Sequence, residues 1–98
     1  MATLFLTVFR DADRVLLDEP IQETTVTIAG ASAQSAAISG SNKEIRSVRL
    51  FADADCFVKW GDNPTALADG TAGMPIGAEN PEVVGVKAGQ LVAVIERV

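Results

Sequence analysis

This chain lacks the histidines and the cysteine clusters on which much of nucleophilic and zinc chemistry depends. Its 98 residues include no histidine and a single cysteine, Cys56. This composition excludes Ser-His and Cys-His nucleophilic catalysis, and it excludes zinc sites built from histidines or from several thiolates. The glycine pair Gly70 and Gly73 lacks the following lysine and the strand-to-helix setting of a phosphate-binding loop. Because Cys56 follows two aspartates, we expect a small core residue rather than a reactive thiol.

Carboxylates are the remaining candidates for acid-base or cation chemistry. Three pairs lie close together in the sequence: Asp11 with Asp13, Asp53 with Asp55, and Glu79 with Glu82. Each pair falls at a predicted turn, where an acidic side chain can bond the neighbouring backbone. The two Asp-Ala-Asp turns could share a Ca²⁺ ion, but neither has the glycine and the distal glutamate of a calcium loop. We therefore predict turn caps, no metal or cofactor, and a protein that is not an enzyme.

Length and charge narrow the class of protein further. A chain of 98 residues corresponds to one domain, which can bury about 60–65% of its unfolded surface without a metal or a disulfide. The 13 acidic and 8 basic residues give a net charge of −5, so the surface would repel phosphates and anionic lipids. We expect neither a nucleic-acid partner nor a membrane partner. The apolar run Leu4–Phe9 is too short for a signal peptide or a membrane span, which predicts a soluble protein made in the cytoplasm.

Short runs of β-prone residues alternate with turn residues along the chain. The expected strands are Thr3–Phe9, Arg14–Leu17, Thr24–Ile28, Ile45–Ala52, Cys56–Trp60, Glu82–Val86 and Leu91–Glu96. Together with a short strand near Gln34–Ile38, this spacing predicts an all-β fold of seven or eight strands, a single-domain antiparallel β-sandwich or jelly roll over residues 1–98. Residues 1–20 are either its first strand or an N-terminal arm.

Three connections determine the details of this prediction. The segment Ala31–Ile38 is rich in alanine but has no helical apolar stripe and lies between two glycines, so we expect a loop and a short strand rather than a helix. The segment Lys87–Gln90 predicts a hairpin turn in which Gly89 adopts a positive φ. Residues 65–80 show little alternation and are expected to form the longest irregular segment.

Alternation within the strands assigns residues to the two faces of each sheet. The predicted core residues are Val26, Ile28, Val48, Leu50, Val58, Trp60 and Val94. Several strands are apolar on their second face as well, where Phe5, Phe9 and Phe57 lie. Since a small sandwich has one interior, we expect another protein, most simply a second copy of the chain, to cover these residues.

The order of six short segments is distinctive. They are Ser32–Ala36, Val48–Leu50, Asp55–Gly61, Asn63–Ala66, Met74–Gly77 and Gly85–Ile95. In this order they resemble small virion proteins that tailed bacteriophages encode among their structural genes. The resemblance covers residues 24–95, and the first twenty residues do not belong to the pattern. It implies a β-sandwich on the capsid surface that acts as a decoration or cement protein and stabilises the head shell.

The resemblance implies a protein that works by adhesion, with no catalytic residues. The implied partners are further copies of the chain, in a homotrimer, and the major capsid protein, with assembly in the cytoplasm of the bacterial host. One alternative is a head-to-tail, tail or fibre component that binds a host receptor, and another is a host-type small binding module or an accessory domain of an enzyme. Arg46, Ser47 and Arg49 are expected at an edge or in solvent, where the arginines could meet acidic capsid groups. The candidate interface residues are Phe5, Phe9, Arg46, Arg49, Phe57, Met74, Pro75 and Ile76.

Overall fold

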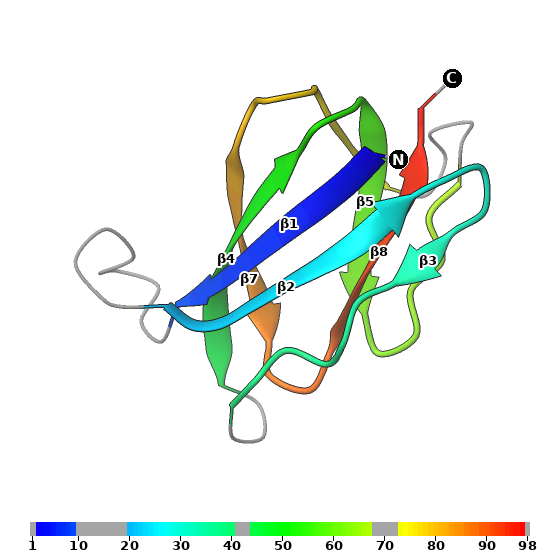
Figure 1. The fold of residues 1–98 in the computed structure, drawn as a ribbon. Helices are drawn as coiled ribbons and strands as arrows, with labels where there is room; N and C mark the ends of the chain where they lie inside the picture. The colour runs from blue at the N-terminus through cyan, green and yellow to red at the C-terminus, as the bar shows by residue number, and fades with distance from the viewer. Residues whose placement is uncertain (1, 10–19, 41–43, 68–72, 98) are drawn as a thin grey trace.

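The computed structural model describes residues 2–9, 20–40, 44–67 and 73–97, and these residues form strands, turns and loops without a helix (Figure 1). The strands are β1 (Ala2–Phe9), β2 (Pro20–Ile28), β3 (Ala33–Gln34), β4 (Ile45–Ala52), β5 (Cys56–Gly61), β6 (Met74–Ile76), β7 (Glu82–Lys87) and β8 (Leu91–Glu96). The predicted all-β fold is confirmed. The described residues therefore contain no long apolar helix that could cross a membrane.

The eight strands form two four-stranded sheets, and every pairing between neighbours is antiparallel. Sheet A has the order β2-β1-β4-β7, and sheet B has the order β3-β8-β5-β6. The connections from β2 to β3, β3 to β4, β4 to β5, β6 to β7 and β7 to β8 pass from one sheet to the other. The chain is therefore wound around a shared interior, which is the antiparallel sandwich that the sequence predicts.

The pairing pattern is that of a jelly roll. The pairs β5 with β6, β4 with β7 and β3 with β8 are nested, as in a long hairpin that is folded over on itself. If this series continued, β2 would pair with a ninth strand. In this chain β1 occupies the position of that strand, between β2 and β4, and pairs with both. Backbone bonds from Asp53 N–H to the Thr3 carbonyl (3.2 Å) and from Arg97 N–H to the Asp55 carbonyl (3.1 Å) tie the start of β1 and the residue after β8 to one turn. Residues 2–9 are thus a central strand of sheet A rather than a separate arm.

The core lies between the sheets and is built from residues that alternate along each strand. Of the predicted core residues, Val26, Ile28, Val48, Leu50, Val58 and Val94 are buried. The prediction is wrong for Trp60, which is only half-buried and packs against the edge of the core. Trp60 lies near the end of β5, opposite Val92, and a large ring with a polar N–H is seldom enclosed completely. The period of two therefore identified the inward residues of β1, β2, β4 and β5 that it named, apart from the incomplete burial of Trp60.

The connection between β7 and β8 corrects one prediction. Gly89 has a φ of 90°, as predicted, but the two strands do not form a hairpin, because β7 pairs with β4 in sheet A and β8 pairs with β5 in sheet B. Val86 and Val92 consequently face the same interior from opposite sheets. The N–H of Gly89 donates to the Ile38 carbonyl (2.8 Å), which anchors the turn to a neighbouring loop instead of closing a two-stranded ladder.

Three other expectations need adjustment. The strand β2 begins at Pro20, earlier than predicted, and the strand that was expected over 14–17 lies outside the described residues. The segment after Gly30 is a loop with a short strand, as predicted, but the strand is Ala33–Gln34. Residues 65–80, expected to be irregular, contain β6, because Met74 and Ile76 pair with β5 and turn towards the core.

Candidate interaction surface

The side chains of Cys56, Asp53 and Asp55, which were candidates for chemistry, are buried or hydrogen-bonded within the fold. The side chain of Cys56 is fully buried, and loss of solvation raises the pKa of its thiol to about 11, so it stays protonated at neutral pH. Asp53 Oδ1 accepts a hydrogen bond from the Thr3 N–H (2.6 Å). Within the described parts of the chain, no three metal-ligating side chains cluster. Asp53 and Asp55 lie at the predicted turn, but their carboxylates bond the backbone of the distant residues Thr3 and Ala78 rather than that of their own turn; Asp11 and Asp13 lie outside the described residues.

Asp55 links three segments at one end of the sandwich. Its carboxylate accepts a hydrogen bond from the Ala78 N–H (2.8 Å) and forms an ion pair with Arg97 (3.3 Å). The bond from the Ala78 backbone, followed by the hydrogen bond and the charge of Arg97, lowers the pKa of Asp55 below its usual value. Asp55 therefore stabilises the connection between β6 and β7 in its ionised form.

We expect Asp55→Ala to lower the melting temperature at neutral pH. A carboxyl with a depressed pKa in the folded state contributes stability that is fully present above its unfolded pKa and is lost as the pH falls through the folded value. The difference between the variant and the unmodified protein should thus shrink as the pH is lowered below about 4. Thermal unfolding over a pH series checks this. Asp62→Ala is the control for an exposed carboxylate, and an Asp55→Ala effect that is equal at all pH values would contradict the assignment.

The chain itself covers part of the outer face of sheet B. Ala66 is buried against Ala93, Ile95 and the half-buried Phe57. Hydrogen bonds hold the covering segment 62–66 in place: the Ala66 N–H donates to Ser32 Oγ (3.1 Å), and Gln34 Nε2 donates to Asn63 Oδ1 (2.9 Å) and to the Pro64 carbonyl (2.8 Å). The expectation that another protein covers the second face of β8 is therefore wrong for Ala93 and Ile95, whereas Phe57 is half-buried and its contact with another protein stays a prediction.

The outer face of sheet A, by contrast, carries exposed apolar side chains over β1, β4 and β7, and polar ones over β2. In register across β1, β4 and β7 its outward positions are Phe5, Thr7, Phe9, Ile45, Ser47, Arg49, Phe51, Val83, Gly85 and Lys87. Phe5, Ile45 and Val83 are 43%, 57% and 52% exposed, and they are three of the four large apolar residues that are exposed in the described part of the chain. This face has no covering segment like that of sheet B among the residues that the structure describes. It is the best candidate for a surface that binds another protein.

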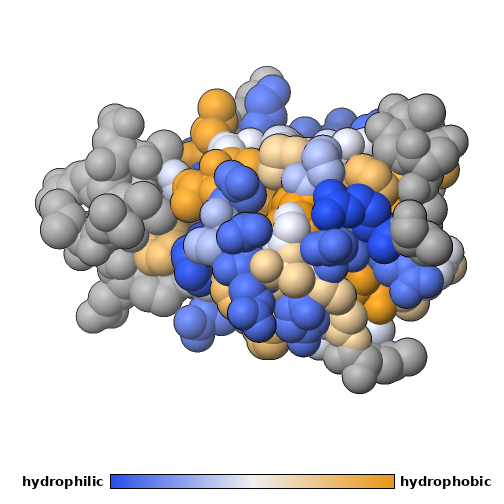
Figure 2. Space-filling model, turned by 90° about the horizontal axis from the view of Figure 1, so that it is seen from above, coloured by the Kyte–Doolittle hydropathy of each residue, from blue (hydrophilic) through white to orange (hydrophobic). Residues whose placement is uncertain are grey.

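Aromatic and charged groups are organised at the centre of this face. The rings of Phe5 and Phe51 lie 6.3 Å apart at 50°, and the guanidinium carbon of Arg49 lies 5.6 Å from the centre of the Phe51 ring. These contacts favour defined orientations of the three side chains in the single chain. Figure 2 shows another side of the molecule, seen from above, where hydrophobic patches are interrupted by hydrophilic residues.

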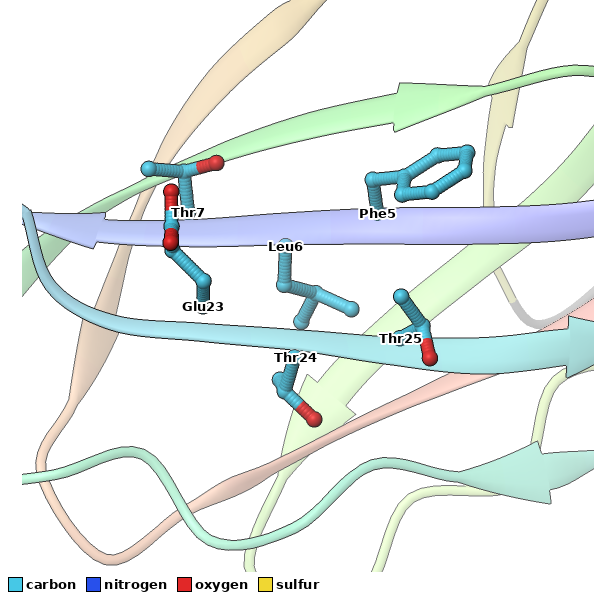
Figure 3. A pocket seen from close by; sticks show the side chains of 6 residues that line it. All are labelled: Phe5, Leu6, Thr7, Glu23, Thr24 and Thr25. Atoms are coloured by element: carbon cyan, nitrogen blue, oxygen red, sulfur yellow. The ribbon is translucent and has the colours of Figure 1, made fainter.

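A shallow hollow of about 460 Å³ lies beside Phe5 on this face (Figure 3). Thr7 and Glu23 are partners in the register of β1 and β2, and Figure 3 shows their side chains leaning towards one another. Phe5 and Thr25, the next outward pair, complete its rim. The hollow is lined by one aromatic ring, one leucine, three threonines and a carboxylate, so it offers both apolar and hydrogen-bonding contacts.

Arg46 is not part of an exposed interface, contrary to prediction. It is 8% exposed, its Nε donates to the Ser39 carbonyl (3.2 Å), and its guanidinium pairs with Glu44 (2.8 Å). These partners allow a charged side chain to be buried in the strand. Ser47 is also buried, between Phe9 and Gly85 in register, whereas Arg49 is exposed as predicted.

The Arg46 guanidinium leaves no room for a side chain at Gly40. A Cβ there would lie 2.6 Å from Arg46 Nε, and the φ of 140° is one that side chains disfavour. We expect Gly40→Ala to reduce the free energy of unfolding by about 1–3 kcal/mol. Gly61→Ala is the matched control, because a Cβ at Gly61 would meet nothing within 4 Å. Chemical denaturation measures both variants, and equal stabilities would contradict this packing.

The other predicted interface residues fall into two groups. Ile76 belongs to the buried core, so the proposed contact through it is wrong; Met74 is half-buried against the core, and both are held by the pairing of β6 with β5. Pro75 is exposed, and Phe9 and Phe57 are half-buried. Sequence reasoning did not include Ile45 and Val83 among the interface residues, although they follow from the same alternation that places Arg49 outward.

No family model, no curated protein and no solved structure matches this chain.

Proposed function

We propose that this chain is a structural virion protein of a tailed bacteriophage, a capsid decoration or cement protein that forms a homotrimer and binds the major capsid protein. The observation that carries the proposal is the contrast between the two sheets. The chain covers the apolar residues Ala93 and Ile95 on the outer face of sheet B with its own segment 62–66, yet it leaves Phe5, Ile45 and Val83 exposed on the outer face of sheet A. Exposed apolar side chains of this kind are suited to binding another protein.

Two further observations support a role in adhesion. The resemblance of residues 24–95 to small phage virion proteins supplies the class, and the jelly roll is a fold of capsid proteins among others. The thiol of Cys56 is buried, and the carboxylates of Asp53 and Asp55 bond backbone N–H groups of distant segments, so these groups contribute to the fold. A cement protein acts through many repeated contacts, in which three linked binding sites reinforce each other.

The proposal is tested with particles of the phage that encodes the chain. Particles that lack the protein should lose infectivity at a lower temperature than complete particles, and adding the purified protein should restore their resistance. Chain counting by quantitative mass spectrometry should give hundreds of copies per particle. A handful of copies would instead support the head-to-tail, tail or fibre alternative, and equal heat resistance with and without the protein would overturn the cement role.

A further inference from the structure

The long edges of sheet A differ from the short edges of sheet B. Sheet A ends in β2, of nine residues, and β7, of six, whereas sheet B ends in β3, of two residues, and β6, of three. Short edge strands offer few backbone groups to another chain, but a long edge strand is a template for further pairing. Apart from the ends of β7 and the side-chain bonds of Gln22, the described residues show no hydrogen bonds that cap the two long edges.

We propose that β2 of one copy pairs with β7 of a second copy, so that sheet A continues from chain to chain. The inference deepens the proposed function, since it names the strands that join the homotrimer. With four antiparallel strands in sheet A, β2 and β7 run in opposite directions. When copies are related by a rotation axis along the strands, β2 of one copy therefore meets β7 of the next as an antiparallel neighbour.

The side chains on the two edges select a single register. The outward residues of β2 are Glu23, Thr25 and Thr27, and those of β7 are Val83, Gly85 and Lys87. If Glu23 lies opposite Lys87, then Thr25 lies opposite Gly85, Thr27 lies opposite Val83, and all six residues of β7 fall within β2.

This register also brings together opposite charges. Glu23 and Lys87 are both exposed, and opposed residues in an antiparallel pair have Cβ atoms about 4.5–5.5 Å apart. A shift of two residues would keep the faces aligned but would place Lys87 opposite Ile21. Glu23 leans over β1 in the single chain (Figure 3), so its exposed side chain rotates outward on pairing. A single copy has two unpaired edges of sheet A, at β2 and at β7, and a closed ring of copies pairs both edges.

The test is a charge exchange, followed by sedimentation of the purified protein from 1 to 100 µM. Lys87→Glu and Glu23→Lys should each weaken self-association by about tenfold or more, because like charges then face each other. The double variant, which restores opposite charges, should associate within about threefold of the unmodified protein. Lys59→Glu, on the outer face of sheet B, makes the same change of charge and should have no effect.

Hydrogen exchange provides a second readout that does not depend on substitution. Within residues 23–28 and 82–87, the amides that point away from β1 and β4, every second one along each strand, should gain protection as the concentration rises, while the amides of 33–34 and 74–76 should not. A monomer at 100 µM, association that is unaffected by the single variants, or a double variant that is not rescued would overturn the inference. An oligomer of another size with the same charge dependence supports the strand pairing and overturns the trimer. Failure to bind capsids, with intact charge rescue, overturns the proposed function alone.

Discussion

Removal of residues 1–9 is expected to abolish cooperative folding. These residues include β1, which lies between β2 and β4 and contributes Leu4, Leu6 and Val8, all at most 1% exposed. Burial of three such side chains stabilises a fold by about 5–9 kcal/mol at 1.5–3 kcal/mol each. A domain of this size is stable by about 5–15 kcal/mol in total, and the truncation also removes two strand pairings.

Thermal unfolding monitored by circular dichroism measures this effect. The truncated chain should give no cooperative transition, whereas Thr7→Ala, an outward position on the same strand, should melt close to the unmodified protein. A truncated chain that retains the sandwich and its melting temperature would show that β1 is a dispensable arm. For the same reason, loss of particle binding after such a truncation would not identify residues 1–9 as a capsid contact.

Leu50→Ala is expected to reduce the free energy of unfolding by about 2–5 kcal/mol. Leu50 is fully buried in the centre of sheet A, where it pairs in register with Leu6. Truncation removes transfer free energy and leaves a cavity that close-packed neighbours from both sheets can fill only in part. Urea denaturation at constant pH measures the change.

Val83→Ala is the matched control, because it also shortens an aliphatic side chain of sheet A but at a position that is 52% exposed. We expect it to change the stability of the single chain by less than about 0.5 kcal/mol. The comparison decides the strand phase, since a shift of one residue would exchange the inward and outward sets. Equal losses for the two variants would contradict the alternation described for β4 and β7.

The alternation of apolar residues identified strands and their inward faces well, but it did not identify strand partners. Val86 and Val92 were both correctly expected to be apolar strand residues, yet the short turn between them joins two sheets rather than a hairpin. Period two reports which face is buried, and it carries no information about the sheet to which a strand belongs. The nested pairing depends on contacts between residues far apart in the chain, such as Ile45 with Lys87.

The candidate surface was predictable only in part, for related reasons. Phe5 and Arg49 were correctly placed outward, because their strands alternate cleanly. Arg46 was misplaced because its burial depends on the Ser39 carbonyl and on Glu44, which local hydropathy does not reveal. The cover over sheet B depends on bonds such as that between Gln34 and Asn63, which are 29 residues apart. A local pattern of residue types does not predict side-chain hydrogen bonds over such separations.

An image reconstruction of purified particles would show whether this chain is a repeated part of the capsid surface. For a cement protein we expect density for the jelly roll at many equivalent positions over the head shell, with three copies around each position and contacts to the major capsid protein. Density confined to the tail, the head-to-tail junction or the fibres would contradict the cement role, as would a head surface that carries no copy of the chain.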